Sequence, residues 1–273
     1  MLTNKELLDD CVKWAKEAGC IQMGYFRKDN LDIRQKFNNS DIVTAADKAS
    51  EEDIIAEIRK KYPSHSILSE ESGADKMTAD YQWVIDPLDG TTNFSSGLPY
   101  FSVSIGIKHR GETIVGVVFA PYLGELFTAI KGEGALLNGE RISCGRKDDL
   151  RQAVVATGFP VDKDRNTDNN TDNVARILPL VRGMRRLGSA AIDICYVACG
   201  NLDAYWELNL HEWDVCAGLL IASEAGATFK HFRSDRNISV IAASPSIMTK
   251  IAPLISEKPF TDDPFGIYHK CLL

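Results

Sequence analysis

The sequence predicts an α+β half over residues 1–145 followed by an α/β half over residues 146–273. Two patterns indicate this division. Residues 101–142 contain apolar runs separated by turn signals, as in antiparallel hairpins. After residue 150, strand-like and helix-like patterns alternate instead. The polar stretch 145–149 separates the two patterns and is therefore the best candidate boundary.

The composition is that of a folded globular protein, with 44% hydrophobic and 25% charged residues among 273. The formal net charge of −7 argues against a nucleic-acid-binding protein. If such an acidic chain binds a phosphate, a bound metal cation is the obvious source of positive charge. No run of 18 apolar residues occurs, so we expect no membrane span. Seven cysteines without a CxxC pair, and no signal-peptide pattern, favour reduced thiols in a cytoplasmic protein.

The first half begins with two predicted helices. The first starts after Thr3 and the second after Thr44, and an acid three residues later completes a capping box in each case. Strands are expected at 66–69 and 81–86, the second ended by Pro87. The hairpin strands that follow are expected at 103–107, 113–119 and 125–130, and a short strand then leads into the turn Asn138-Gly139.

The second half alternates between strands and helices, with glycines 200 and 226 ending two of the helices. The strands are expected at 153–157, 184–187, 204–208 and 238–243. The helices are expected at 173–181, 189–199 and 214–225, and Ser244-Pro245 opens a last one.

The most informative segment is 83–94, which reads WVIDPLDGTTNF. An apolar strand runs into Asp86 and Asp89, which with the Leu88 carbonyl offer the oxygen ligands that Mg²⁺ prefers. Gly90 would let the backbone approach a phosphate, and a helix starting there would direct N–H groups toward it. A plain turn is the alternative, because Asp-Pro and Asp-Gly are common loop dipeptides. Taken alone, the segment leaves both interpretations open.

Other acids have similar settings. Glu70 and Glu71 follow a short apolar strand and could complete a metal site beside Asp86, although adjacent acids usually lie in a solvated loop. Asp47 and Asp214 each lie at the start of a helix, where an acid ordinarily acts as a cap.

Another strand–turn–helix junction follows Arg185 and Arg186. For these two arginines, a solvated edge or a subunit contact is the preferred interpretation over catalysis.

Together these segments resemble the inositol monophosphatase family of Mg²⁺-dependent, lithium-sensitive phosphatases. Residues 86–94 match the first family signature and residues 213–218 the second. The resemblance covers nearly the whole chain, and 70–72, 132–139 and 188–190 match in the same order. It implies a layered α-β-α-β-α sandwich of the inositol monophosphatase/fructose bisphosphatase type, usually a homodimer.

The resemblance also implies roles for individual residues. Thr91 and Asp47 would orient or deprotonate the attacking water, and Glu70 would join them in catalysis. Gly90 and Thr91 would bind the phosphate through backbone N–H groups. The implied metal ligands are Glu70, Asp86, Asp89, Asp214 and the Leu88 carbonyl. The implied substrate-side residues are Asp89, Gly188, Ser189, Ala190 and Glu207.

The implied activity is Mg²⁺-dependent hydrolysis of a phosphate monoester, inositol monophosphate or a similar polyol or sugar phosphate, by in-line attack of a metal-bound water. The alternatives are a fructose-1,6-bisphosphatase, a 3′-phosphoadenosine nucleotidase, or a regulatory protein that retains the fold. Nucleotidases resembling this family tend to carry Lys-Glu where this chain has Thr92-Asn93, which favours the monophosphatase. The presence of every implied ligand favours an enzyme that has kept its activity.

Overall fold

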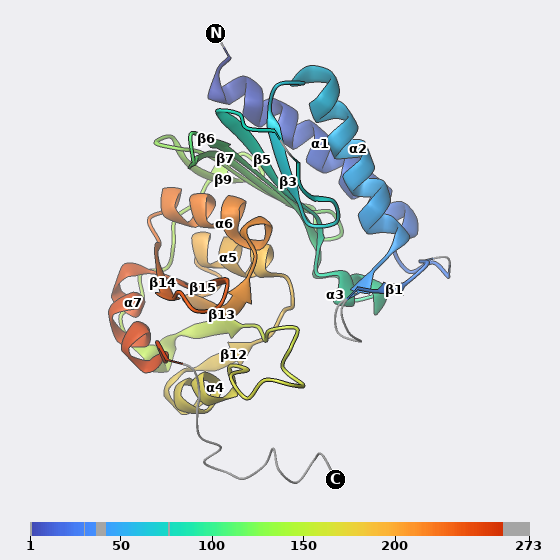
Figure 1. The fold of residues 1–273 in the computed structure, drawn as a ribbon. Helices are drawn as coiled ribbons and strands as arrows, with labels where there is room; N and C mark the ends of the chain where they lie inside the picture. The colour runs from blue at the N-terminus through green and yellow to red at the C-terminus, as the bar shows by residue number, and fades with distance from the viewer. Residues whose placement is uncertain (1, 30, 37–41, 76, 259–273) are drawn as a thin grey trace.

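The computed structural model describes residues 2–29, 31–36, 42–75 and 77–258, and two β-sheets form its framework (Figure 1). The larger sheet has eight strands in the order β10-β9-β8-β7-β6-β5-β3-β4, and the smaller has five in the order β12-β11-β13-β15-β14. The strands of the larger sheet are β3 (Ser66–Ser69), β4 (Gly73–Ala74), β5 (Tyr81–Asp89), β6 (Ser102–His109), β7 (Glu112–Ala120), β8 (Glu125–Ile130), β9 (Gly134–Leu137) and β10 (Glu140–Arg141). Those of the smaller sheet are β11 (Val154–Thr157), β12 (Gly183–Arg185), β13 (Ala204–Leu210), β14 (Thr228–Arg233) and β15 (Ile238–Ala243). Strands β1 (Arg34–Gln35) and β2 (Ile42–Val43) pair separately.

Helices cover the sheets in alternating layers (Figure 1). The helices α1 (Asn4–Tyr25) and α2 (Ala45–Lys61) lie on one face of the larger sheet. The helices α5 (Ala190–Ala198) and α6 (Glu212–Glu224) lie between the two sheets. The helices α4 (Thr171–Ile177) and α7 (Pro245–Ile251) cover the outer face of the smaller sheet. The expected α-β-α-β-α sandwich is therefore confirmed. No helix of the described residues is long and apolar enough to cross a membrane.

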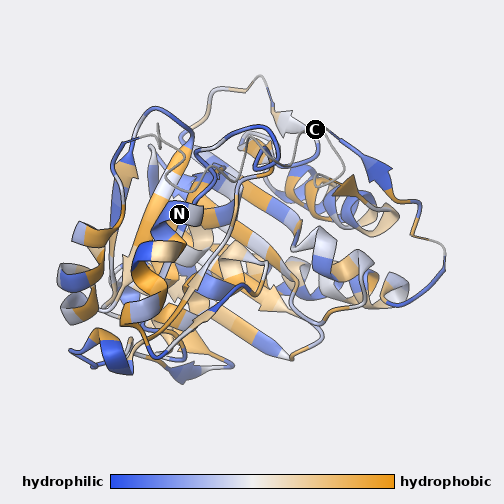
Figure 2. Ribbon diagram, turned by 90° about the horizontal axis from the view of Figure 1, so that it is seen from below, coloured by the Kyte–Doolittle hydropathy of each residue, from blue (hydrophilic) through white to orange (hydrophobic). Residues whose placement is uncertain are grey.

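The alternation of side chains along the strands separates the buried clusters. On β13, Tyr205 packs with α5 and α6, whereas its neighbour Trp206 packs with α4 and α7 on the opposite face. Trp14 of α1 contacts Trp83 of β5, with ring centroids 5.3 Å apart. Figure 2 shows apolar residues concentrated in the central strands and hydrophilic residues in the surrounding loops. The central strands of each sheet are thus buried on both faces, as their apolar runs require.

Helix α6 packs directly on the backbone of β6 and β7 because two glycines leave room for it. A Cβ atom at Gly106 would lie 2.5 Å from Cys216 Sγ, and one at Gly116 would lie 2.8 Å from the Ala217 carbonyl oxygen. This close approach brings the first turn of α6, which carries Asp214, against the sheet that carries Asp86.

Several predicted elements differ from the structure in their bounds. Strand β5 was expected to end at Asp86 but continues through Pro87 to Asp89. Its pairing with β6 is irregular between the two aspartates and resumes at Asp89. Helix α6 begins at Glu212, two residues before the predicted start, so Asp214 is its third residue and not its cap.

In the second half, one predicted helix needs correction and one strand was not predicted. The predicted helix 173–181 divides into α4 and a 3₁₀ turn at Leu178–Leu180, where Pro179 cannot continue the hydrogen-bond ladder. Strand β14 was not predicted because its first four residues are exposed and lack an apolar alternation. The division of the chain into two domains near residue 145 stays a prediction.

We expect Gly116→Ala to destabilise the protein by about 1–3 kcal/mol, because the added methyl group would clash with helix backbone and not with a flexible side chain. The matched control is Gly24→Ala near the end of α1, where a Cβ meets nothing within 4 Å and stability should stay within about 1 kcal/mol of wild type. Urea unfolding of both variants measures the difference. Equal stabilities would contradict the tight α6 packing.

Candidate functional site

Four buried or half-buried carboxylates converge where β5 ends and helices begin, and we call Glu70, Asp86, Asp89 and Asp214 the carboxylate cluster. Glu70 follows β3, Asp86 and Asp89 lie at the end of β5, and Asp214 lies in the first turn of α6. Their closeness affects the pKa of Asp86, which burial raises first and the nearby charges of Glu70, Asp89 and Asp214 raise further. The structure therefore brings together all four of the side chains that the sequence suggested as ligands.

Asp89 joins the two halves of the chain. Its Oδ2 atom accepts a 2.6 Å hydrogen bond from the Ser189 hydroxyl and a 2.8 Å bond from the Ala191 N–H. Ser189 is also the N-cap of α5, so the same hydroxyl accepts a bond from Ile192 N–H. Burial raises the pKa of Asp89 to about 6, while the bonds from Ser189 and Ala191 act in the opposite direction.

Within the cluster, Asp86 and Asp214 are strongly disfavoured as anions. Burial and then the charge of Glu70 raise the pKa of both well above the ordinary range of an aspartate. Asp86 accepts a local 3.0 Å bond from Leu88 N–H, and Asp214 accepts a 2.6 Å bond from His211 N–H. Such a group of hard oxygen donors fits a divalent cation such as Mg²⁺, because a cation would offset their repulsion.

The side chains do not form a ready-made coordination shell. Within the described ranges, no three His, Cys, Asp or Glu side chains place their ligand atoms close enough together to hold an ion. Glu70 forms a 2.8 Å ion pair with Lys36, which also pairs with Glu71. The donor types, their burial and their repulsion fit a cation. To bind that cation, Glu70 would have to give up its ion pair with Lys36.

Asp47 and Thr91 form a hydrogen-bonded pair beside the cluster. Asp47 is fully buried, and its Oδ2 accepts bonds of 2.8 and 2.6 Å from the Thr44 N–H and hydroxyl. Its Oδ1 accepts a 2.9 Å bond from the Thr91 hydroxyl, which also lies 3.0 Å from the Leu88 carbonyl oxygen. The cap expected from the sequence is therefore present, and the second oxygen of the same carboxylate faces the site. Burial raises the pKa of Asp47.

Gly90 adopts a left-handed conformation, with φ at +93°, and begins the short helix α3 (Thr91–Ser95). A Cβ atom there would lie 2.8 Å from the Tyr100 carbonyl oxygen, so no larger residue fits without a shift of the backbone. The helix whose start was considered near Gly90 is thus present, and it follows Asp89 directly.

A cavity of about 110 Å³ adjoins the cluster on the side of α5 and β13. Glu207, Gly188 and Ala190, all expected on the substrate side, line it together with Asp89 and Asp214. Burial raises the pKa of Glu207 to about 7, although a hydrogen bond from the Tyr205 hydroxyl opposes the shift.

The same cavity includes two residues that the sequence did not place in the site. Arg186, interpreted as an edge or subunit residue, lies in its lining, and so does Asp193, four residues after Ser189 in the first turn of α5. Helical spacing from Ser189 was the signal that could have indicated Asp193.

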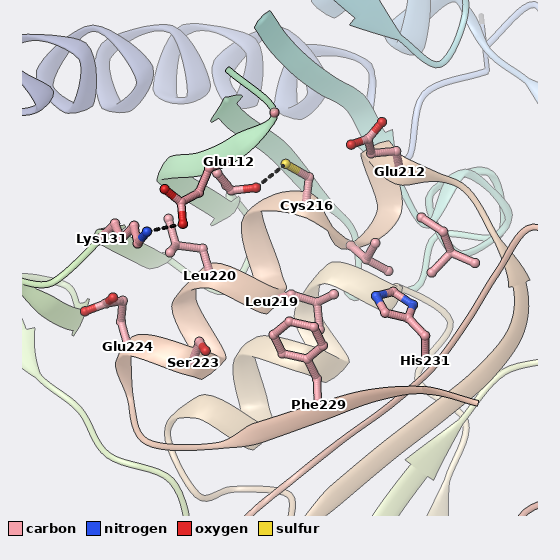
Figure 3. A pocket seen from close by; sticks show the side chains of 14 residues that line it. Glu112, Lys131, Glu212, Cys216, Leu219, Leu220, Ser223, Glu224, Phe229 and His231 are labelled. Atoms are coloured by element: carbon pink, nitrogen blue, oxygen red, sulfur yellow. Dashed lines mark hydrogen bonds and ion pairs between the residues drawn. The ribbon is translucent and has the colours of Figure 1, made fainter. Parts of the chain in front are cut away.

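Another cavity, of about 400 Å³, lies on the outer side of α6 and is unrelated to the cluster (Figure 3). Figure 3 shows apolar side chains of α6 and β14, among them Leu219, Leu220 and Phe229, at its centre. None of its lining residues belongs to the carboxylate cluster. Cys216 lies at its edge, and it is one of six described cysteines that are all free, as expected; Cys271 lies outside the described residues.

Comparisons with known proteins find similar sequences and similar structures. Residues 4–259 match the inositol monophosphatase family. The Nus factor SuhB of Pasteurella multocida is 45% identical over 92% of this chain and 98% of its own. The solved inositol monophosphatase of Anabaena (Nostoc) sp. PCC 7120 is 36% identical with a TM-score of 0.83, covering 92% of this chain and 96% of that one. The solved suhB protein of Bartonella henselae is 33% identical with a TM-score of 0.85, covering 91% and 97%.

In metal-free protein at neutral pH, we expect Asp86→Asn to raise the free energy of unfolding. The pKa of Asp86 is higher in the folded than in the unfolded state, so its contribution to stability is present below the unfolded pKa and is lost as the pH rises through the folded pKa. Asparagine keeps the acceptor for Leu88 N–H and removes the charge. Denaturant unfolding in EDTA between pH 5 and 8 should give a flatter profile for the variant.

The matched control is Asp168→Asn, because Asp168 is a buried acid whose charge is compensated by Arg233 at 2.6 Å. This change should cost up to about 3–5 kcal/mol, since it removes the buried carboxylate opposite Arg233 and leaves that arginine only the exposed Asp235 as an ion-pair partner. If both variants lose stability, the proposed repulsion at Asp86 is wrong.

Proposed function

Because the chain belongs to the inositol monophosphatase family and is a phosphatase, we propose that it hydrolyses inositol monophosphate or a similar polyol or sugar phosphate in a Mg²⁺-dependent reaction. The observation that carries this proposal is the carboxylate cluster next to the Asp47–Thr91 pair. The carboxylate cluster supplies ligands for a cation, and the Asp47–Thr91 pair supplies a route for a proton.

The residues that would hold the magnesium are Glu70, Asp86, Asp89, Asp214 and the Leu88 carbonyl. When bound there, Mg²⁺ supplies the positive charge that attracts the phosphate and makes the attacking water more acidic. This charge also explains how a chain with a net charge of −7 binds an anionic ester.

The remaining chemistry falls to this chain's own groups. Thr91 Oγ1 holds the attacking water and receives its proton as its own proton moves to Asp47 Oδ1, 2.9 Å away. Backbone N–H groups of Gly90 and Thr91 bind the phosphate at the start of α3. Glu207, Gly188 and Ala190, which line the 110 Å³ cavity, contact the alcohol half together with the neighbouring Ser189 at the start of α5. The alcohol half leaves on that side as an alkoxide and takes a proton from solvent water.

Phosphate release from a substrate panel, with and without Mg²⁺, tests the proposal. The panel contains inositol 1-phosphate, fructose 1,6-bisphosphate and 3′-phosphoadenosine 5′-phosphate. Preferred hydrolysis of the first, abolished by EDTA, supports it, and preference for either of the others selects the corresponding alternative. We extend the proposal to inhibition by Li⁺, a homodimeric assembly and a cytoplasmic location, which a Li⁺ titration, sedimentation and cell fractionation would test.

A second candidate function is a regulatory role, and the observation that favours it is the likeness to a relative named as a Nus factor. The phosphatase site and such a role are separable. Asp214→Asn should remove hydrolysis, so its ability to replace that relative in the relative's own cell tests the second function alone. Failure of both the wild type and the variant to replace it would reject this role.

Magnesium should raise the melting temperature of the wild-type protein by several degrees at saturation, because a ligand of the folded state stabilises it. Asp214→Asn, which lacks a proposed ligand, should lose most of that increase. Asp172→Asn, an exchange in the first turn of α4 far from the cluster, is the control and should keep it. An equal increase in all three proteins would contradict the assignment of Asp214.

Thr91→Ala and Asp47→Asn should each lower kcat by about 10²–10⁴, because each removes one partner of the proton route. The double variant should be little worse than the poorer single variant, since either change already interrupts the route. Thr92→Ala, at the exposed neighbouring position, is the matched control and should retain kcat within a few fold. Losses that multiply in the double variant would show that the two residues act independently.

A further inference from the structure

We propose that Asp193 is a second hydroxyl-binding residue for the alcohol half of the substrate, which acts beside Glu207 and sets a preference for polyhydroxylated, uncharged alcohols. The inference rests on the proposed phosphatase function and adds a specificity-determining residue to it. Three observations support it: the burial of Asp193, its lack of a partner, and the cavity that it shares with Glu207.

Asp193 is buried without a structural role that would explain it. The side chain is 2% exposed in the first turn of α5, and its Oδ1 atom has no hydrogen-bond partner within the described part of the chain. A buried carboxylate oxygen without a partner costs stability, so such a group is rarely kept for packing alone. Its two acidic neighbours do have partners, because Asp89 accepts hydrogen bonds from Ser189 and Ala191, and Glu207 accepts one from Tyr205.

The groups that face Asp193 do not satisfy it. Burial raises its pKa, Glu207 and Asp89 raise it further, and only Arg186 opposes the shift. No hydrogen bond or ion pair joins Arg186 to Asp193 in the described structure, and the arginine is exposed at the cavity edge. A donor that arrives from the cavity would complete the hydrogen bonding of this carboxyl group.

Two carboxyl groups, those of Asp193 and Glu207, line the same cavity. Asp193 enters its lining from α5 and Glu207 from β13, with Gly158 beside them. A Cβ atom at Gly158 would lie 2.0 Å from Glu207 Oε2, so glycine keeps open the space in which this carboxyl group lies. Tyr205 donates to Glu207 Oε2, which leaves Oε1 for a ligand.

This pair determines the chemical class of the alcohol. Two neighbouring carboxyl groups are matched by an alcohol with at least two further hydroxyl groups, because each hydroxyl can donate one hydrogen bond. A second phosphate in the same place would bring an anion against two acids, which disfavours bisphosphates. The cavity adjoins Asp89 and Asp214. One substrate molecule can therefore place its alcohol half in the cavity and its phosphate at the cluster.

The test compares kcat/KM for inositol 1-phosphate with kcat/KM for p-nitrophenyl phosphate, a monoester without hydroxyl groups. In Asp193→Ala, the ratio of the two values should fall at least tenfold, chiefly through KM for inositol 1-phosphate. Asp193→Asn keeps one acceptor oxygen and should recover part of the loss. Asp172→Asn, a first-turn acid of α4 paired with Arg176, is the control and should leave the ratio unchanged.

Stability separates this role from a structural one. Asp193→Ala should melt at or above the wild-type temperature in EDTA, because it removes a buried, unpartnered acid from a helix. A lower melting temperature with an unchanged substrate ratio, or equal losses on both substrates, overturns the inference while leaving the phosphatase proposal intact. A wild type that hydrolyses neither substrate overturns both, and a wild type without preference for inositol 1-phosphate overturns the inference alone.

Discussion

The repulsion among buried carboxylates at the end of β5 is the constraint on which the rest of the site depends. Asp86, Asp89 and Asp214 all have raised pKa values because they are buried and lie near one another and Glu70. Buried like charges held together lower the stability of the fold, and a bound cation would offset this cost. The remaining structure can be understood as the means of holding these groups in place.

Contacts between distant segments hold the cluster together. The Ser189–Asp89 hydrogen bond spans 100 residues and fixes the start of α5 against the end of β5. The glycines at 106 and 116 let α6 lie on the sheet, which brings Asp214 to the same edge. Asp47 has two uses, because one of its oxygens completes the capping box of α2 and the other holds Thr91. Local stability and the arrangement of the site therefore depend on the same atoms.

Much of the fold was predictable because its signals are local. The capping boxes at Thr3 and Thr44, the Asn138-Gly139 turn and most strands lie where the sequence indicates. The exposed strand β14 and the continuation of β5 past Pro87 were not predictable, since sheet pairing overrides the local signal in both places. The candidate site residues were predicted from several family motifs in order, and Asp193 was missed because it lies outside the matched segments.

By itself, the sequence determined the donors: the acids, the hydroxyl groups, the glycines and the order of strands and helices that carry them. Only the tertiary structure decided which acids meet, which of them are buried, and that Asp193 shares a cavity with Glu207. The physical reason is that burial and repulsion act between atoms that are close in space. The positions of Glu70, Asp86 and Asp214 along the chain do not show that these residues are close, because they come together only when the sheets and helices pack.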